Sequence, residues 1–224
     1  MTAFSQNLRT IVYIDGFNLY YGLKQKYGRK YMWLNIENFA KNISPSHSVL
    51  VSTKYFTSRL KGFSTDPEKL RRQSQFLRAV KTLHPNVVTI EGNYQSFQSH
   101  CKHCDNFINC SHCGEPHVKP NEKKTDVNIA TSMLVDAFED RCDIQILVSG
   151  DSDYEFTLQE LRRLFPQKEI IIAFPPKRRN NKLVGEDKCT SFFDIPEEAF
   201  IYSQFPDRIL IDGKKPIERP DNWV

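Results

Sequence analysis

Short hydrophobic runs alternate with longer amphipathic segments along most of this chain. The runs show little polar alternation, which is typical of strands buried on both faces of a parallel sheet, and they occupy residues 10–14, 49–56, 87–91, 144–148 and 169–174. Segments of helical character lie between them, at residues 36–43, 67–83, 126–139 and 154–164. Because strands that alternate with helices favour parallel pairing through right-handed crossovers, we expect a three-layer α/β/α sandwich around a central parallel sheet of about five strands.

The interval between the third strand and the next helix is polar and long. Ordinary connections of this kind have roughly 2–6 residues, whereas this one covers residues 93–124. We therefore expect a small insertion with a structure of its own at residues 95–122, within a domain that spans residues 9–205. A short helix is expected near residues 197–202, and residues 206–224 follow as a proline-containing C-terminal tail.

The composition of the chain indicates where the protein is located and which partners are compatible with it. The chain has 224 residues, of which 39% are hydrophobic, and none of its apolar runs is long enough to span a bilayer. Its first residues lack the pattern of a secretory signal, so we expect a cytoplasmic protein. A net charge of +4 permits a polyanionic partner such as RNA without requiring one. Packing of residues 209–224, with Trp223, on a second copy would produce a homodimer.

Aspartates follow the predicted strands at the edge where parallel sheets place their functional sites. Asp15 closes the first strand, and Asp151 and Asp153 follow the fourth in VSGDSDYEF. Asp126 begins the helix that leads into that fourth strand. Carboxylates gathered in this way repel one another, and a hard cation such as Mg²⁺ or Mn²⁺ would offset the repulsion. Such an ion activates water and stabilises charge on a phosphate, so the pattern favours phosphodiester hydrolysis.

Each of these polar residues also has a purely structural interpretation. Asp151 or Ser152 could cap the helix that follows, since Ser152 and Glu155 have the spacing of a capping box. Asp126 could cap its own helix in the same way. Asp15 fits capping less well, because it ends a buried strand and is followed by a turn glycine, and Asn18 could be a local turn residue.

Three segments carry a resemblance to a known family. YIDGFNLYYG near the start, KKTDVNIATSML in the middle and ILVSGDSDYEFTLQELRR late in the chain resemble the signature segments of the NYN domain family, a branch of the PIN-like nucleases. The resemblance implies a PIN-like, Rossmann-like sandwich, a Mg²⁺ or Mn²⁺ site and metal-dependent cleavage of RNA. By motif position it assigns Asp15, Asp126, Asp151 and Asp153 to the acidic catalytic cluster, with Asn18 beside it.

One departure from the family pattern affects the expected activity. Many members carry a further aspartate in the helix after KTD, where this chain has Thr131 or Ser132, and Asp136 lies one turn further along. The alternative to a ribonuclease is therefore a catalytically weak or inactive PIN-like module that binds RNA or protein. A small-molecule or nucleotide enzyme is a third hypothesis, although the chain has no glycine-rich phosphate loop of the GxGxxG or GxxxxGK type.

The insertion contains two CxxC pairs in CKHCDNFINCSHC. Four thiolates at this spacing predict a closed, structural Zn²⁺ site formed by Cys101, Cys104, Cys110 and Cys113. A mixed site would instead include some of the interleaved histidines, which are His100, His103, His112 and His117, and redox disulfides are a third option. The zinc loop would stand beside the acidic cleft and present Lys102, Lys119, Lys123 and Lys124 to a substrate, or it would only stabilise the chain locally.

Basic and aromatic residues near the same edge predict an RNA-binding surface. PPKRRNNK follows the last predicted strand, and its side chains would neutralise phosphates of single-stranded RNA laid across the metal site. The RNA-binding residues we predict are Lys124, Lys177, Arg178, Arg179 and Lys182. A solvated surface loop is the alternative. Stacking on unpaired bases is a further option, against ordinary packing, for Tyr20, Tyr21 and Tyr154.

Overall fold

The computed structural model describes residues 7–59, 67–84, 86–101, 103–104 and 106–223. These residues form a seven-stranded sheet with the order β4-β3-β2-β1-β5-β6-β7. Its strands are β1 (Leu8–Asp15), β2 (Ser48–Ser58), β3 (Val87–Gln98), β4 (Val118–Lys123), β5 (Ile144–Val148), β6 (Glu169–Phe174) and β7 (Ser191–Asp194). Neighbouring strands are parallel except for β3 and β4, which are antiparallel.

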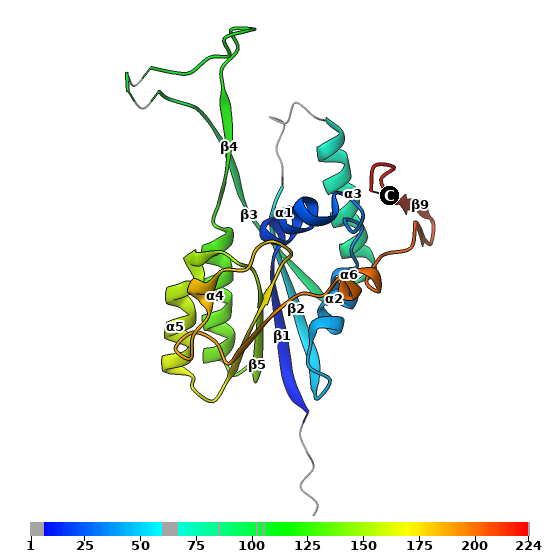
Figure 1. Cartoon of the computed structure of the whole chain (residues 1–224). Coiled ribbons are helices and arrows are strands. Elements are labelled where there is room, and N and C mark those ends of the chain that lie inside the picture. The colour runs from blue at the N-terminus through cyan, green and yellow to red at the C-terminus, as the bar shows by residue number, and fades with distance from the viewer. Residues whose placement is uncertain (1–6, 60–66, 85, 102, 105, 224) are drawn as a thin grey trace, which may run out of the picture.

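Helices cover both faces of the sheet and complete the predicted three-layer sandwich (Figure 1). One face carries α1 (Gly16–Tyr27), α2 (Ile36–Ile43), α3 (Pro67–Leu83) and α6 (Glu197–Ile201). The other carries α4 (Thr125–Phe138) and α5 (Glu155–Leu164). All five strands predicted from the hydrophobic runs are present, and β7 and β4 extend the sheet at its two edges.

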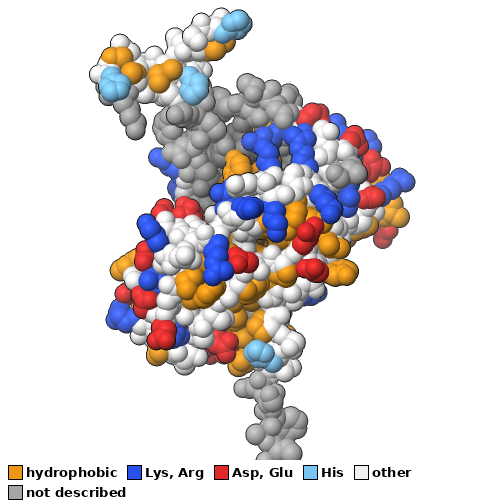
Figure 2. All heavy atoms as spheres, in the orientation of Figure 1, with side chains coloured by type: hydrophobic (Ala, Val, Ile, Leu, Met, Phe, Trp, Pro, Cys, Tyr) orange, Lys and Arg blue, Asp and Glu red, His pale blue; other side chains and the backbone are white. Residues whose placement is uncertain are grey.

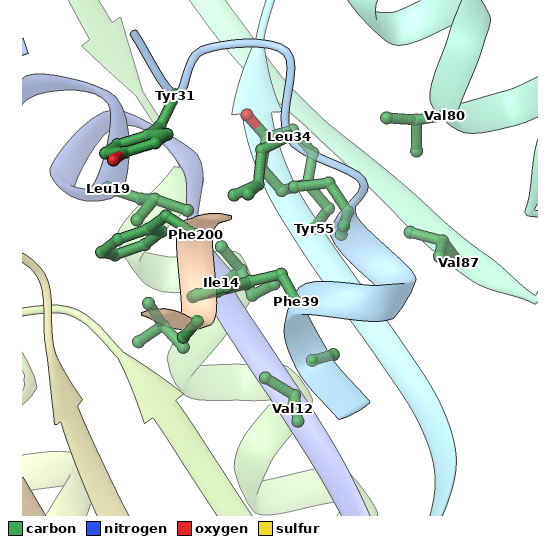
Figure 3. Close-up of a cluster of buried hydrophobic side chains, with 14 of the residues drawn as sticks. Val12, Ile14, Leu19, Tyr31, Leu34, Phe39, Tyr55, Val80, Val87 and Phe200 are labelled. Carbon is green, nitrogen blue, oxygen red and sulfur yellow. The ribbon is translucent and has the colours of Figure 1, made fainter. Parts of the chain in front are cut away.

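A separate hydrophobic cluster fills the space on each side of the sheet. On the α1 side, Leu19 from α1, Phe39 from α2 and Tyr55 from β2 belong to one cluster of buried side chains (Figure 3). On the other side, Ile129 from α4 and Leu158 from α5 are fully buried. Burial on both faces explains why β1, β5 and β6 lack polar alternation.

The first helix corrects the sequence interpretation of the DGFN segment. Gly16 is not part of a turn, because α1 begins there and continues to Tyr27. Asp15 ends β1 and also caps α1, since its side chain accepts a hydrogen bond from the backbone N–H of Asn18. Asn18 therefore lies in the first turn of a helix, and the expectation that Asp15 does not begin a helix was wrong.

The polar interval forms a long hairpin. Strands β3 and β4 pair antiparallel from Asn93 opposite Lys123 to Gln98 opposite Val118. The hairpin projects from one end of the sandwich and carries the cysteine segment at its tip (Figure 1). Lys102 lies outside the described residues, and so does the side chain of Lys119.

The C-terminal tail packs on its own chain. Strands β8 (Arg208–Ile211) and β9 (Lys214–Glu218) form a second, two-stranded sheet. Beyond it, the Trp223 ring lies 6.2 Å from that of Trp33 and 6.0 Å from that of Phe76. The residue that suggested a dimer contact is therefore buried within one chain. Within the described ranges, none of the helices has the length and hydrophobicity needed to cross a bilayer.

Candidate functional site

Two neighbouring strands bring Asp15 to the centre of the carboxyl edge of the sheet. Ile14 of β1 pairs with Val148 of β5, so the residues that follow, Asp15 and Ser149, lie side by side. The Ser149 hydroxyl donates a hydrogen bond of 3.0 Å to Oδ2 of Asp15, and the Asn18 backbone N–H donates one of 3.0 Å to Oδ1. Only 4% of Asp15 is exposed. The carboxylate is thus held in one orientation by the start of α1 and the end of β5.

The environment of Asp15 raises its pKa from 3.8 to about 6. Burial is the main cause, and the hydrogen bonds from Asn18 and Ser149 oppose it. The negative charges of Asp126 and Asp151 add to the increase. Asp15, Asp126 and Asp151 therefore lie close enough to interact electrostatically, so the fold brings these three aspartates to one place.

Tyr154 connects two of these carboxylates. Its hydroxyl donates a hydrogen bond of 2.8 Å to Oδ1 of Asp126 and lies 3.5 Å from Oδ2 of Asp15. Burial, followed by the charges of Asp15 and Asp126, raises the pKa of the Tyr154 hydroxyl well above its usual value, so it stays a donor. With 1% of the residue exposed, Tyr154 is buried and does not stack on RNA bases. Sequence reasoning named this tyrosine but missed its contacts with the aspartates.

Hydrogen bonds from two segments of the chain hold the SGD loop, residues 149–151, in place. The Asn18 side-chain oxygen accepts a hydrogen bond of 3.1 Å from the Gly150 N–H, and the Asn180 amide donates one of 3.0 Å to the Gly150 carbonyl. A Cβ atom at Gly150 would lie 1.7 Å from the carbonyl oxygen of Arg178, so only glycine fits. Asn18 thus positions the SGD loop, and Asn180 is a contributor that no sequence pattern indicated.

The capping interpretation holds for one aspartate of the later motif. Oδ1 of Asp151 accepts a hydrogen bond of 3.1 Å from the Asp153 N–H and caps the 3₁₀ turn η1 (Ser152–Tyr154). The second carboxylate oxygen of Asp151 takes no part in this capping bond. The same side chain can therefore cap the turn and ligate a metal ion. Asp153 is exposed at the start of that turn. Asp126 does not cap α4, since Lys124 is the N-cap residue and no side-chain cap bond forms there.

Asp136 belongs to a different, structural network. It is 0% exposed, accepts a hydrogen bond of 2.6 Å from the Tyr13 hydroxyl, and lies 2.6 Å from the Lys54 ammonium and 3.0 Å from Arg141. These partners occupy both carboxylate oxygens of Asp136. Asp136 therefore does not take the role of the aspartate that many family members carry where this chain has Thr131 or Ser132.

No metal group is preassembled in the part of the chain that the structure describes: no three His, Cys, Asp or Glu side chains are arranged to hold an ion.

The four hairpin cysteines form two separate pairs. Backbone N–H groups and the Cys104 thiol lower the pKa of Cys101, and the same arrangement with Cys113 lowers that of Cys110. The zinc site is therefore not confirmed and stays a prediction.

The predicted RNA-binding residues differ in their surroundings. Arg178 is half-buried beside Gly22 and Gly150, and among the described residues its buried Nε has no hydrogen-bond partner. Arg179 instead forms an ion pair of 2.7 Å with Asp194 at the end of β7. The remaining three are exposed, namely Lys124, Lys177 and Lys182. Figure 2 shows Lys and Arg side chains gathered over the upper part of the body, below the hairpin.

A parallel α/β sandwich with carboxylates at the ends of its central strands is consistent with the PIN-like class. The match to a family model makes this assignment specific, because residues 9–196 match the model of the NYN domain. The chain belongs to the NYN domain family. NYN domains are nuclease-like, and this family membership agrees with the three sequence segments that suggested it.

Two similar proteins add different information. The chain is 28% identical to the 6-hydroxy-3-succinoylpyridine 3-monooxygenase HspA of Pseudomonas putida (strain DSM 28022 / S16), across 98% of this chain and 76% of that protein. The crystal structure of VPA0982 from Vibrio parahaemolyticus RIMD 2210633, a protein of unknown function, is similar with a TM-score of 0.53 and 20% identity. That similarity covers 88% of this chain and 98% of the other, and it supports the fold alone.

Proposed function

We propose that this protein is a metal-dependent ribonuclease that hydrolyses phosphodiester bonds of single-stranded RNA. The observation that carries the proposal is the convergence of Asp15, Asp126 and Asp151, whose mutual repulsion helps to raise the pKa of Asp15 to about 6. A buried carboxylate with two anionic neighbours is stabilised by a cation. Membership of a nuclease-like family supports the same reaction class.

The donor set suits Mg²⁺ or Mn²⁺. These ions prefer carboxylate oxygens, and Mg²⁺ usually keeps several waters while using one or two carboxylates and the phosphates of a substrate. A preassembled group of three ligands is therefore not required. Asp15 and Asp126 would hold the ion, with Asp151 and the exposed Asp153 acting directly or through water. When bound, the ion would supply an activated water and offset charge on the scissile phosphate.

The remaining residues of the site would orient these groups. Tyr154 and Ser149 donate hydrogen bonds to the carboxylates of Asp126 and Asp15, respectively, and so limit their rotation. Asn18 fixes the backbone that precedes Asp151 through the Gly150 N–H. Such partners of metal ligands reduce the reorganisation needed when substrate binds.

Arg178 is the strongest candidate for contact with the RNA backbone. Its backbone packs directly on Gly150, the residue before Asp151, and its Nε is buried without a partner among the described residues. Because Nε is closed to solvent, a phosphate near the acidic cluster would pair with the rest of the half-buried Arg178 guanidinium. Lys177, Lys182 and Lys124 would add exposed positive charge, whereas Arg179 would first have to leave Asp194.

We also propose that Zn²⁺ joins the two cysteine pairs at the hairpin tip. The lowered pKa values of Cys101 and Cys110 favour the thiolate form that zinc requires. Because a closed site with four thiolates leaves no position for water, its role would be structural.

The experiment combines a metal series with one isosteric variant. Labelled single-stranded RNA and DNA of the same sequence are incubated with Mn²⁺, Mg²⁺ or EDTA, using wild type, Asp151→Asn and the control Asp212→Asn. Asp212 is exposed in the turn between β8 and β9. We expect metal-dependent RNA cleavage that Asp151→Asn abolishes and Asp212→Asn leaves unchanged. RNA binding without cleavage under every metal would replace this proposal with the RNA-binding module.

One relative favours a second candidate, an enzyme that acts on a small aromatic acid. The name of the Pseudomonas relative specifies a succinoylpyridine as the compound on which that protein acts. In this chain, a pocket beside Asp15 is lined by Tyr20, Tyr55 and Arg72, among others. Turnover of the compound in the relative's name, with no cleavage of RNA, would establish this candidate in place of the nuclease.

A further inference from the structure

A pocket of about 90 Å³ lies between α1, the end of β2 and the first turns of α3. On this measure one water needs about 10–15 Å³, so the pocket has room for a group the size of a six-membered ring. Its floor is part of the hydrophobic core, where Leu34 and Tyr55 lie close together (Figure 3). At its rim, Tyr21 is 44% exposed and Tyr20 is half-buried.

The walls of this pocket are mainly aromatic and aliphatic. Aromatic rings are contributed by α1, β2, α3 and the C-terminal tail, and they include Tyr20, Tyr55, Phe76 and Trp223. The rings of Tyr55 and Phe76 meet edge to face at 5.9 Å. Flat apolar walls of this kind favour a planar ring, which gains both buried area and ring–ring contact.

Cationic side chains lie on the α3 side of the same pocket. Arg72 and Lys69 line it, and only 8% of Arg72 is exposed. A guanidinium is planar and presents paired N–H donors that match the oxygens of a carboxylate or phosphate. Both side chains already have a partner within the chain, and an anion would share their remaining N–H donors. The pocket thus combines an apolar slot with positive charge on one side.

The pocket and the acidic cluster share a boundary. Gly16 follows Asp15 and lines the pocket, and a Cβ atom there would lie 2.7 Å from the Tyr55 hydroxyl. Burial, and then the charge of Asp15, raise the pKa of that hydroxyl. A ligand in the pocket would therefore lie next to the aspartates rather than on a distant surface.

We propose that this pocket binds a planar aromatic ring that carries an anionic group, with the ring between the aromatic walls and the anion at Arg72 and Lys69. One source of this chemistry is a nucleotide of the RNA, whose base would enter the slot while a neighbouring phosphate lies at the aspartates. The other is a free aromatic acid. The proposal rests on the proposed nuclease function only for the first source.

The test measures binding with EDTA present, so that cleavage does not interfere. Uridine 5′-monophosphate and pyridine-3-carboxylate are titrated calorimetrically into the full chain. We expect saturable binding of one probe at one site. Its affinity should fall at least about 10-fold in Arg72→Gln, because that substitution removes a charge-assisted contact. The partly exposed Lys69→Gln and Tyr20→Leu provide variants with less risk to folding. The control Lys24→Gln removes an exposed charge from α1 and should bind as wild type does.

The outcomes separate the pocket from the nuclease. Binding of the nucleotide alone assigns the pocket to RNA, and binding of the pyridine acid alone assigns it to a free aromatic acid. Binding of neither probe, or wild-type binding in folded Arg72→Gln, Lys69→Gln and Tyr20→Leu, would overturn the pocket. Metal-dependent RNA cleavage without probe binding would contradict only the pocket proposal. Probe binding without cleavage would contradict only the nuclease proposal.

Discussion

At the scale of single residues, the site is defined by hydrogen bonds that hold carboxylates close together. Asp15 is buried and Asp126 is half-buried, and the Tyr154 hydroxyl lies between them. The aspartates were predictable because they follow strands. Tyr154 and Ser149 were not, because a hydroxyl that packs against a carboxylate has no sequence pattern of its own.

Replacement of Tyr154 by phenylalanine tests the positioning of Asp126. Phenylalanine keeps the buried ring and removes only the donor, so we expect the apparent affinity for Mn²⁺ or the cleavage rate to fall about 10–100-fold, as is typical for partners of metal ligands. Unfolding in urea should change by no more than about 1 kcal/mol. Tyr202→Phe, at a residue that is 75% exposed, is the matched control. Unchanged Mn²⁺ dependence would show that the hydroxyl has only a packing role.

Replacement of Asp15 by asparagine should make the protein more stable at neutral pH. The folded-state pKa of about 6 lies above the ordinary value of 3.8, so the native state loses stability as pH rises between these values. Asparagine still caps α1 and carries no charge. In EDTA, we expect a gain of up to about 3 kcal/mol at pH 8, and little gain at pH 3, where both forms are neutral. Urea unfolding at the two pH values measures this, and an equal effect at both would contradict it.

At the scale of elements, the sequence identified the buried strands well and the edge strands poorly. The five central strands contain runs that are largely apolar, whereas β7 is four residues long and mostly exposed. Strand β4 contains a proline and polar residues, and its pairing depends on β3 rather than on its own pattern. Helix α1 was missed because Gly16 and Asn18 resemble a turn, although Leu19 and Leu23 have helical spacing.

The hairpin formed by β3 and β4 should bind zinc without affecting the stability of the sandwich. Elemental analysis is expected to find one zinc per chain, and a variant with Cys101→Ser and Cys110→Ser should lose it. Because the hairpin projects from the body (Figure 1), the urea midpoint of the sandwich should stay within experimental error. Ser111→Ala serves as a control in the same segment. A metal-free wild type with four freely titrating hairpin thiols would rule the zinc site out.

At the scale of the whole molecule, the C-terminal tail contributes to the core of the domain. Trp223 contacts rings from the segment after α1 and from α3, and it also lines the aromatic pocket. Sequence alone suggested a contact with a second copy, because nothing in the tail shows which surface it covers. The tail's position was decided by long-range packing, which local patterns do not encode.

Truncation of the Trp223 side chain should therefore destabilise the domain without changing its mass in solution. The residue is 6% exposed, so Trp223→Ala is expected to lower the free energy of unfolding by about 3–5 kcal/mol. Tyr202→Ala removes an exposed ring and should have little effect. Urea unfolding and light scattering provide the two measurements. A change in molecular mass with unaltered stability would show instead that Trp223 contacts a neighbouring chain.

The sheet order has a consequence for when activity can first appear during protein synthesis. Asp15 and Ser149 form one hydrogen bond but are separated by 134 positions in the chain. A ribosome that has completed only the first half of the polypeptide has made one carboxylate of the site and none of its later partners. The aspartates can come together only after Tyr154 has left the exit tunnel and β5 has paired with β1. The ribonuclease that we propose would therefore be unable to cut its own messenger for as long as β5 is still unmade.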